Sequence, residues 1–209
     1  MKSNATTYLL FSYIEKDLQL SGTICTPSYL VKKYQAKYPQ CSVVEAVPAF
    51  GSQQEATAAY RYIYKLFLRI IDSVCDDLNK YHGVNLSKNN WMLLLGQWLL
   101  SYLFHQYSIY QQVIKNFNFL SNIRTVGYSY HDKAGNRDTL DAVKYMKSND
   151  SYIDSVARVI EFLGHSESVT YIKSIQEAGC QRKSWYDRIK FHIKRHIIFA
   201  YNRIASYFS

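Results

Sequence analysis

The chain has 209 residues, of which 48% are hydrophobic, and this is enough to bury the core of one full-sized domain. Its net charge is +9, but residues 182–209 carry seven Lys and Arg against one Asp, a charge of +6 that leaves +3 for the other 181 residues. So uneven a distribution argues against a nucleic-acid-binding surface across the whole domain.

Cysteine usage and hydropathy indicate the compartment. The four cysteines are widely spaced without a C-x-x-C pair, and the N-terminus has no signal-peptide pattern. The longest apolar run, from Trp91 to Phe104, has 14 residues, whereas a membrane span needs about 20. We therefore expect a cytoplasmic protein.

Short strands and a helix are predicted in the first fifty residues. Residues 18–25 alternate between apolar and polar, and residues 42–47 form a β-branched run, so both predict strands. Residues 28–38 between them have helical spacing, which Pro39 ends. A strand, a helix and a strand in this order favour a parallel pair.

Two long helices are predicted next. The segment from Ser52 to Glu55 has the form of a capping box, and the apolar stripe after it continues to Leu78 before Gly83 ends the helix. Ser87 caps a second helix that is apolar almost all round, so we expect it to be the most buried element.

The last third of the chain predicts a third strand and more helices. The strand is expected at 123–128, and helices at about 138–147, 151–163 and 166–178. Residues 183–208 place apolar side chains on one stripe and most Lys and Arg elsewhere, which is typical of a basic amphipathic helix.

The predicted fold class is therefore α/β and helix-rich. We expect a short parallel sheet of about three strands, a buried central helix and a basic C-terminal amphipathic helix. The predicted boundary separates an N-terminal α/β domain, residues 1–181, from a basic amphipathic helix or linker, residues 182–209.

No known catalytic signature is complete, so candidate residues come from their positions. His82 lies in the turn between the two long helices, where it either binds an anion or acts as a general base, or else hydrogen-bonds the turn. Asp150 precedes a predicted helix and is a catalytic carboxylate or an N-cap. Gln97 interrupts an apolar helix, which indicates either close packing or a polar group that faces a ligand.

Metal and cofactor sites are not predicted. His192 and His196 have the spacing of two ligands on one helix face, but no third ligand is nearby. The acidic residues of the first long helix, Asp72, Asp76 and Asp77, have the spacing of a solvated face.

One stretch resembles a known family. The run from Leu78 to Asn85, followed by Trp91, Gly96 and Trp98, is similar to the LN-x-x-HG…W-x-x-x-x-G-x-W-L stretch of glycosyltransferase-like transferases encoded in bacterial surface-polysaccharide and lipopolysaccharide gene clusters. Weaker similarity surrounds Gly22 to Cys25 and Ser148 to Asp150. Family members continue into a second α/β half, so this chain resembles their N-terminal half.

The resemblance implies a role in sugar transfer. In two-domain sugar-nucleotide transferases the donor binds the second half and the acceptor meets the first, so this chain is expected to supply an acceptor-side cleft without a complete active site. The implied catalytic residues are His82 and Asp150. The implied residues for binding a sugar nucleotide or a glycan acceptor are Asn85, Gln97, Trp91 and Trp98.

The alternative is a non-catalytic module that binds through its basic C-terminal helix. Its partner is then either an anionic membrane surface, with the protein peripheral on the inner membrane, or a C-terminal partner domain. The residues expected at that contact are Arg188, Lys190, Lys194 and Arg195.

Overall fold

The computed structural model describes residues 6–117, 120, 122–129 and 149–173. Within them, five parallel strands form one sheet in the order β3-β2-β1-β4-β5. The strands are β1 (Thr7–Leu9), β2 (Thr23–Thr26), β3 (Ser42–Glu45), β4 (Ile123–Ser129) and β5 (Val169–Lys173).

The α/β class and the parallel sheet are confirmed, but the expected number of about three strands was wrong. The sequence pattern missed β1, because a strand of three residues is too short to show an alternation. It also assigned a helix to 166–178, where the structure has a 3-10 turn, Ser166–Ser168, followed by β5. The β-branched residues Val169, Thr170 and Ile172 explain why this segment is a strand.

The strand expected at 18–25 was also placed too early. Only its last three residues belong to β2, because Gly22 adopts a φ of 123° and a Cβ there would lie 2.3 Å from the carbonyl oxygen of Thr6. Leu20 is buried and Leu18 half-buried, and both pack in the core from a loop. Their apolar pattern therefore records burial and not a strand.

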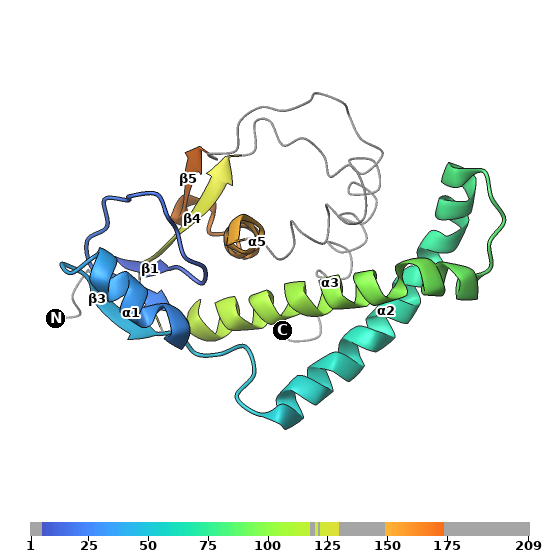
Figure 1. The fold of residues 1–209 in the computed structure, drawn as a ribbon, viewed down its shortest axis with the longest axis horizontal. Coiled ribbons are helices and arrows are strands. Elements are labelled where there is room, and N and C mark those ends of the chain that lie inside the picture. The colour runs from blue at the N-terminus through green and yellow to red at the C-terminus, as the bar shows by residue number, and fades with distance from the viewer. Residues whose placement is uncertain (1–5, 118–119, 121, 130–148, 174–209) are drawn as a thin grey trace.

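Helices cover both faces of the sheet (Figure 1). Leu10 and Ile24 pack toward α1 (Ser28–Lys37), whereas Leu9 and Cys25, their neighbours in the chain, pack in the other core cluster. This second cluster includes side chains from α3 (Lys88–Phe117) and α5 (Asn149–Phe162). The alternation along β1 and β2 thus separates two apolar layers.

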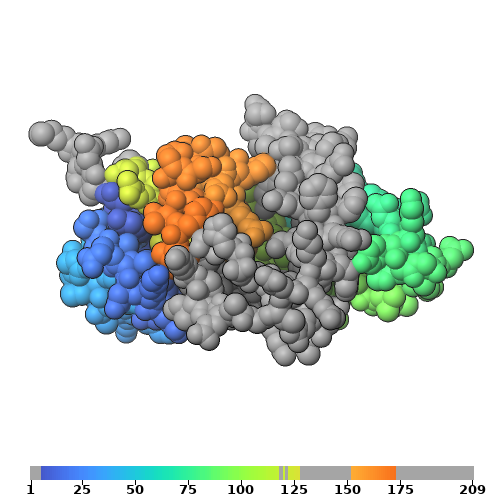
Figure 2. Space-filling model, turned by 90° about the horizontal axis from the view of Figure 1, so that it is seen from above, coloured from blue at the N-terminus to red at the C-terminus, as the bar shows by residue number. Residues whose placement is uncertain are grey.

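A helical hairpin, formed by α2 (Gln53–His82) and α3, projects from the sheet (Figures 1 and 2). Each helix has 30 residues and spans about 45 Å. Since α2 follows the carboxyl end of β3 and α3 leads back to the amino end of β4, the hairpin extends from the carboxyl edge of the sheet. No helix in the described part of the chain is long and apolar enough to cross a bilayer.

The predicted ends of the two long helices are confirmed. The Ser52 hydroxyl accepts from the Glu55 amide at 3.2 Å, and the Glu55 carboxylate accepts from the Gly51 amide at 2.9 Å. Gly83 ends α2 with a left-handed φ of 64°, and the Ser87 hydroxyl accepts from the Asn90 amide at 3.3 Å.

The helix expected to be the most buried element is buried mainly in its second half. Ile109 and Val113 are fully buried beneath the sheet, but Leu93 and Leu94 near the start of α3 are 85% and 63% exposed. The reason is that the first half of α3 lies in the hairpin, where only α2 is in extensive contact with it among the described elements.

Candidate functional site

The strand order creates a switch point at the carboxyl edge of the sheet. From β1 the chain moves to β2 and β3 on one side, and β4 and β5 lie on the other side. Connections from the neighbouring strands β1 and β4 therefore leave in opposite directions. In open α/β sheets ligands bind in the crevice outside the carboxyl ends of such strands.

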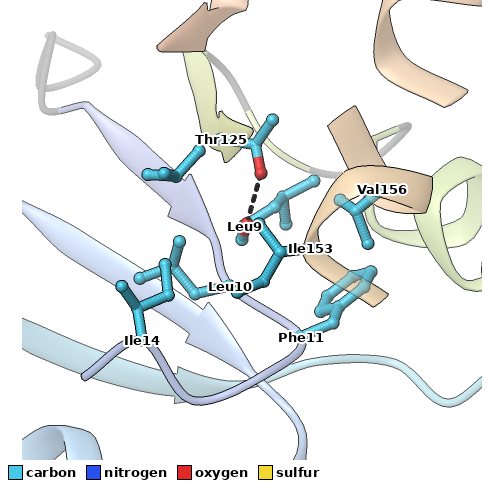
Figure 3. A pocket seen from close by; sticks show the side chains of 8 residues that line it. Leu9, Leu10, Phe11, Ile14, Thr125, Ile153 and Val156 are labelled. Carbon is cyan, nitrogen blue, oxygen red and sulfur yellow. Dashed lines mark hydrogen bonds between the residues drawn. The ribbon is translucent and has the colours of Figure 1, made fainter. Parts of the chain in front are cut away.

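The floor of this crevice is apolar (Figure 3). A cavity of about 10 Å³ lies at the end of β1, with room for no more than a water-sized molecule. The hydroxyl of Thr125 in β4 donates to the carbonyl of Leu9 at 2.8 Å and fixes the two strand ends together. The lining residues are Leu9, Leu10, Phe11, Ile14, Thr125, Val126, Ile153 and Val156.

The loop after β1 is held in place by side chains from its neighbours. The Thr26 hydroxyl donates to the Leu10 carbonyl at 2.6 Å. The Tyr34 hydroxyl donates to the Ser12 carbonyl at 2.7 Å and accepts from the Ile14 amide at 3.2 Å. These bonds satisfy backbone groups of the loop that have no strand partner.

Two tyrosines contribute uncharged hydroxyls at this edge. Tyr152, in the first turns of α5, donates to Gln112 Oε1 at 3.0 Å, and burial together with the field of Tyr29 raises the pKa of Tyr152 to about 12. Tyr29 is 71% exposed and donates to the Phe11 carbonyl across 3.4 Å, a long bond that a ligand could replace. Burial also raises the pKa of Tyr29, so both phenols remain protonated at neutral pH.

His105 of α3 lies beside Tyr152. The two rings meet edge to face with centroids 5.4 Å apart. Its Nε2 is buried and has no hydrogen-bond partner among the described residues, and burial lowers the pKa of the imidazole below its ordinary value of 6.5. Burial therefore keeps the imidazole neutral at pH 7 and disfavours its protonation.

The residues predicted around His82 gather at the far end of the hairpin. His82 is exposed as the last residue of α2, and its ring lies 5.7 Å from that of Trp91. Trp91 is 5% exposed and donates from Nε1 to Asn79 Oδ1 at 3.0 Å, whereas Asn85 is exposed in the turn. Along α3, Gln97 is exposed, whereas its neighbour Gly96 is buried, and a Cβ there would lie 3.4 Å from the Phe67 ring.

Trp98 lies on the same hairpin. Its ring stacks on Tyr102 at 5.7 Å, and its Nε1 is buried without a hydrogen-bond partner in the described part of the chain. The predicted residues thus lie in the half of the hairpin that is far from the sheet, whereas the crevice lies at the carboxyl edge of the sheet.

The remaining predictions concern residues that lie outside the described part of the chain. Asp150 begins α5 at the carboxyl edge, but its side chain lies outside them. The boundary at 181, the basic C-terminal helix with Arg188, Lys190, Lys194 and Arg195, and the helix at 138–147 lie outside them as well. Among the residues that are described, no three His, Cys, Asp or Glu side chains are grouped to hold a metal ion.

Sequence reasoning missed the residues that meet at the crevice. Tyr29, His105 and Tyr152 come from three helices and share no local motif. The only signal was the position of Tyr29 and Tyr152 in first helical turns after a parallel strand, which places side chains at the carboxyl edge.

A family model described as LIC12162 family transferase matches residues 6–205 of the chain. No curated protein and no solved structure matches it.

Proposed function

The chain belongs to the LIC12162 family of transferases, and from this membership we propose that it takes part in sugar transfer during the synthesis of a cell-surface polysaccharide. In this proposal the chain is the N-terminal half of the transferase and supplies its acceptor side. The observation that carries the proposal is the switch point between β1 and β4, together with the uncharged hydroxyls of Tyr29 and Tyr152, which lie near each other.

The polar groups at the crevice suit a hydroxyl-bearing acceptor. Neutral phenols exchange hydrogen bonds with sugar hydroxyls without a charge that must be desolvated. Tyr29 is the group best able to change partner, because its bond to Phe11 is long and its side chain is exposed.

Sugar transfer also needs a base. The bond between the anomeric carbon and the nucleotide phosphate breaks, the phosphate leaves with the electron pair, and the acceptor oxygen bonds to the anomeric carbon as it loses its proton. His105 is our first candidate to receive that proton, because its Nε2 has no hydrogen-bond partner among the described residues and its imidazole is neutral. Asp150, at the start of α5, is the second candidate, and His82, on the hairpin, is the third.

The test is a transfer assay with labelled nucleotide sugars and glycan or lipid-linked acceptors. We expect His105→Gln to lower the rate about 100-fold or more, as is typical when a general base is removed. His82→Gln tests the third candidate and should lower the rate less than His105→Gln does. An equal loss in His82→Gln and none in His105→Gln would move the base to the hairpin, and a folded protein that binds no nucleotide sugar and no acceptor would refute the proposal.

The charge of residues 182–209 favours a second, compatible role. We propose that Arg188, Lys190, Lys194 and Arg195 contact an anionic membrane surface, where each cation contributes about 1 kcal/mol. Co-sedimentation with anionic and neutral vesicles tests this role. Reversal of these four charges should abolish binding to the anionic vesicles only, and unchanged binding would contradict it.

A further inference from the structure

The exposed face of α2 carries a stripe of charged residues that changes sign along the helix. The stripe lies opposite the face that packs on α3, and all of its side chains are exposed. The residues follow one another at steps of three or four, so they share one side of the helix. They are Arg61, Lys65, Arg69, Asp72 and Asp76.

The sequence of signs makes the stripe complementary to itself. Two cations, Arg61 and Lys65, precede the middle of the helix, and two carboxylates, Asp72 and Asp76, follow it, while Arg69 lies at the middle itself. Arg61 and Asp76 are equally far from the midpoint between positions 68 and 69, and so are Lys65 and Asp72. When two copies of α2 lie antiparallel about that midpoint, each cation in these pairs faces a carboxylate of the other copy.

We propose that α2 pairs antiparallel with α2 of a second copy of this chain and forms a symmetric dimer through this stripe. The same patch then serves both partners, as a twofold axis requires. Arg61 of one copy faces Asp76 of the other, and Lys65 faces Asp72 in the same way. The twofold symmetry forms each of these ion pairs twice.

Groups within the chain leave the stripe open to a partner. Only Asp72 of the five has an ion pair in the part of the chain that is described, with Lys88 of α3. This pair is exposed and occupies Oδ1, so the second carboxylate oxygen is available to a partner lysine. Exposed pairs of this kind contribute little and exchange readily.

Apolar and aromatic side chains flank the stripe and supply contact area. Leu68, at the midpoint, is half-buried, and Tyr62 and Tyr64 are 39% and 40% exposed. The aliphatic stems of Lys65 and Arg69 add apolar surface beside them. In Figure 2 the end of the hairpin that lies far from the sheet projects from one side of the molecule.

Sedimentation velocity on the full chain tests the dimer. We expect the wild-type protein to have twice the chain mass at low ionic strength and to dissociate as salt is added. The variants R61E/K65E and D72K/D76K should each be monomeric, because their stripes place like charges opposite each other. Mixed in equal amounts, the two variants should form a heterodimer, since every pair across the interface is then attractive.

The matched control is K16E/K32E, which changes the net charge as much as R61E/K65E at exposed positions outside the hairpin. It should remain dimeric. A wild-type monomer at low salt, or double-reversal variants that dimerise like the wild type, would overturn the proposal. Dimers that resist salt and survive both reversals would show an interface elsewhere on the chain.

Discussion

The hydroxyl of Tyr152 donates to Gln112 Oε1 at 3.0 Å and thereby ties α5 to α3 at the carboxyl edge of the sheet. Both helices come from crossovers that lead to different strands, β4 and β5, so this bond joins segments that are separate in sequence. It also fixes the position of the ring beside His105.

Tyr152→Phe is expected to lower the free energy of unfolding by about 1 kcal/mol, because it removes one hydrogen bond and leaves the Gln112 oxygen without its donor. Urea titration measures this loss. Because the folded-state pKa is about 12 against an ordinary 10.0, the contribution of Tyr152 is complete below pH 10.0 and is lost as the pH rises toward 12. The decline of wild-type stability in that window should be shallower in the variant, and identical profiles would contradict the assignment.

His105→Gln should change how the free energy of unfolding depends on pH. Burial lowers the folded-state pKa of His105, so the unfolded chain binds the proton more tightly and wild-type stability falls as the pH drops below 6.5. The variant should lose less stability in the same range. Urea titrations of both proteins from pH 7 to pH 5 measure the two slopes, and equal slopes would contradict this prediction.

Asn79→Ala should weaken the end of the hairpin. The Asn79 amide donates to the Leu86 carbonyl and its oxygen accepts from the Leu86 amide, both at 2.9 Å, while Trp91 adds a third bond. Loss of the three bonds is expected to cost about 2 kcal/mol in unfolding free energy. Asn85→Ala is the matched control, and its exposed position predicts a change within about 0.5 kcal/mol. Equal effects would show that the Asn79 bonds are not formed in solution.

Gly22→Ala should be among the most destabilising single changes near the sheet. The left-handed φ of 123° alone costs about 1–3 kcal/mol with a side chain, and the added Cβ would also lie against the Thr6 carbonyl. A Cβ at Gly51 would make only ordinary van der Waals contact, with its nearest atom at 3.8 Å, so Gly51→Ala should be nearly neutral. Thermal unfolding of both variants compares them, and a Gly22→Ala protein as stable as Gly51→Ala would exclude the strained turn.

The long helices were predictable because their determinants are local. Ser52, Glu55 and Gly83 act within one turn of the helix end they define, so a short window of sequence contains the whole signal. The apolar stripe of α2 has the helical period and faces α3 as expected. The class of the fold followed from these helices and from the β-branched runs of β3 and β4.

The remaining strands depend on their partners. The segment Thr7–Leu9 is a strand only because β2 and β4 pair with it on both sides, and Val169–Lys173 is one because it pairs with β4. Hydrogen bonds between strands join residues far apart in sequence, so no local period records them.

The sequence by itself determined where α2 begins and ends, where α3 begins, the α/β class, and a family resemblance centred on Leu78 to Leu103. The tertiary structure decided the strand order, and with it the switch point that brings Tyr29, His105 and Tyr152 to one edge. It also placed His82 at the far end of the hairpin (Figure 1). The physical reason is that caps and stripes stabilise a helix through neighbours in sequence, whereas a crevice forms between elements whose proximity only the paired sheet and its packed helices establish.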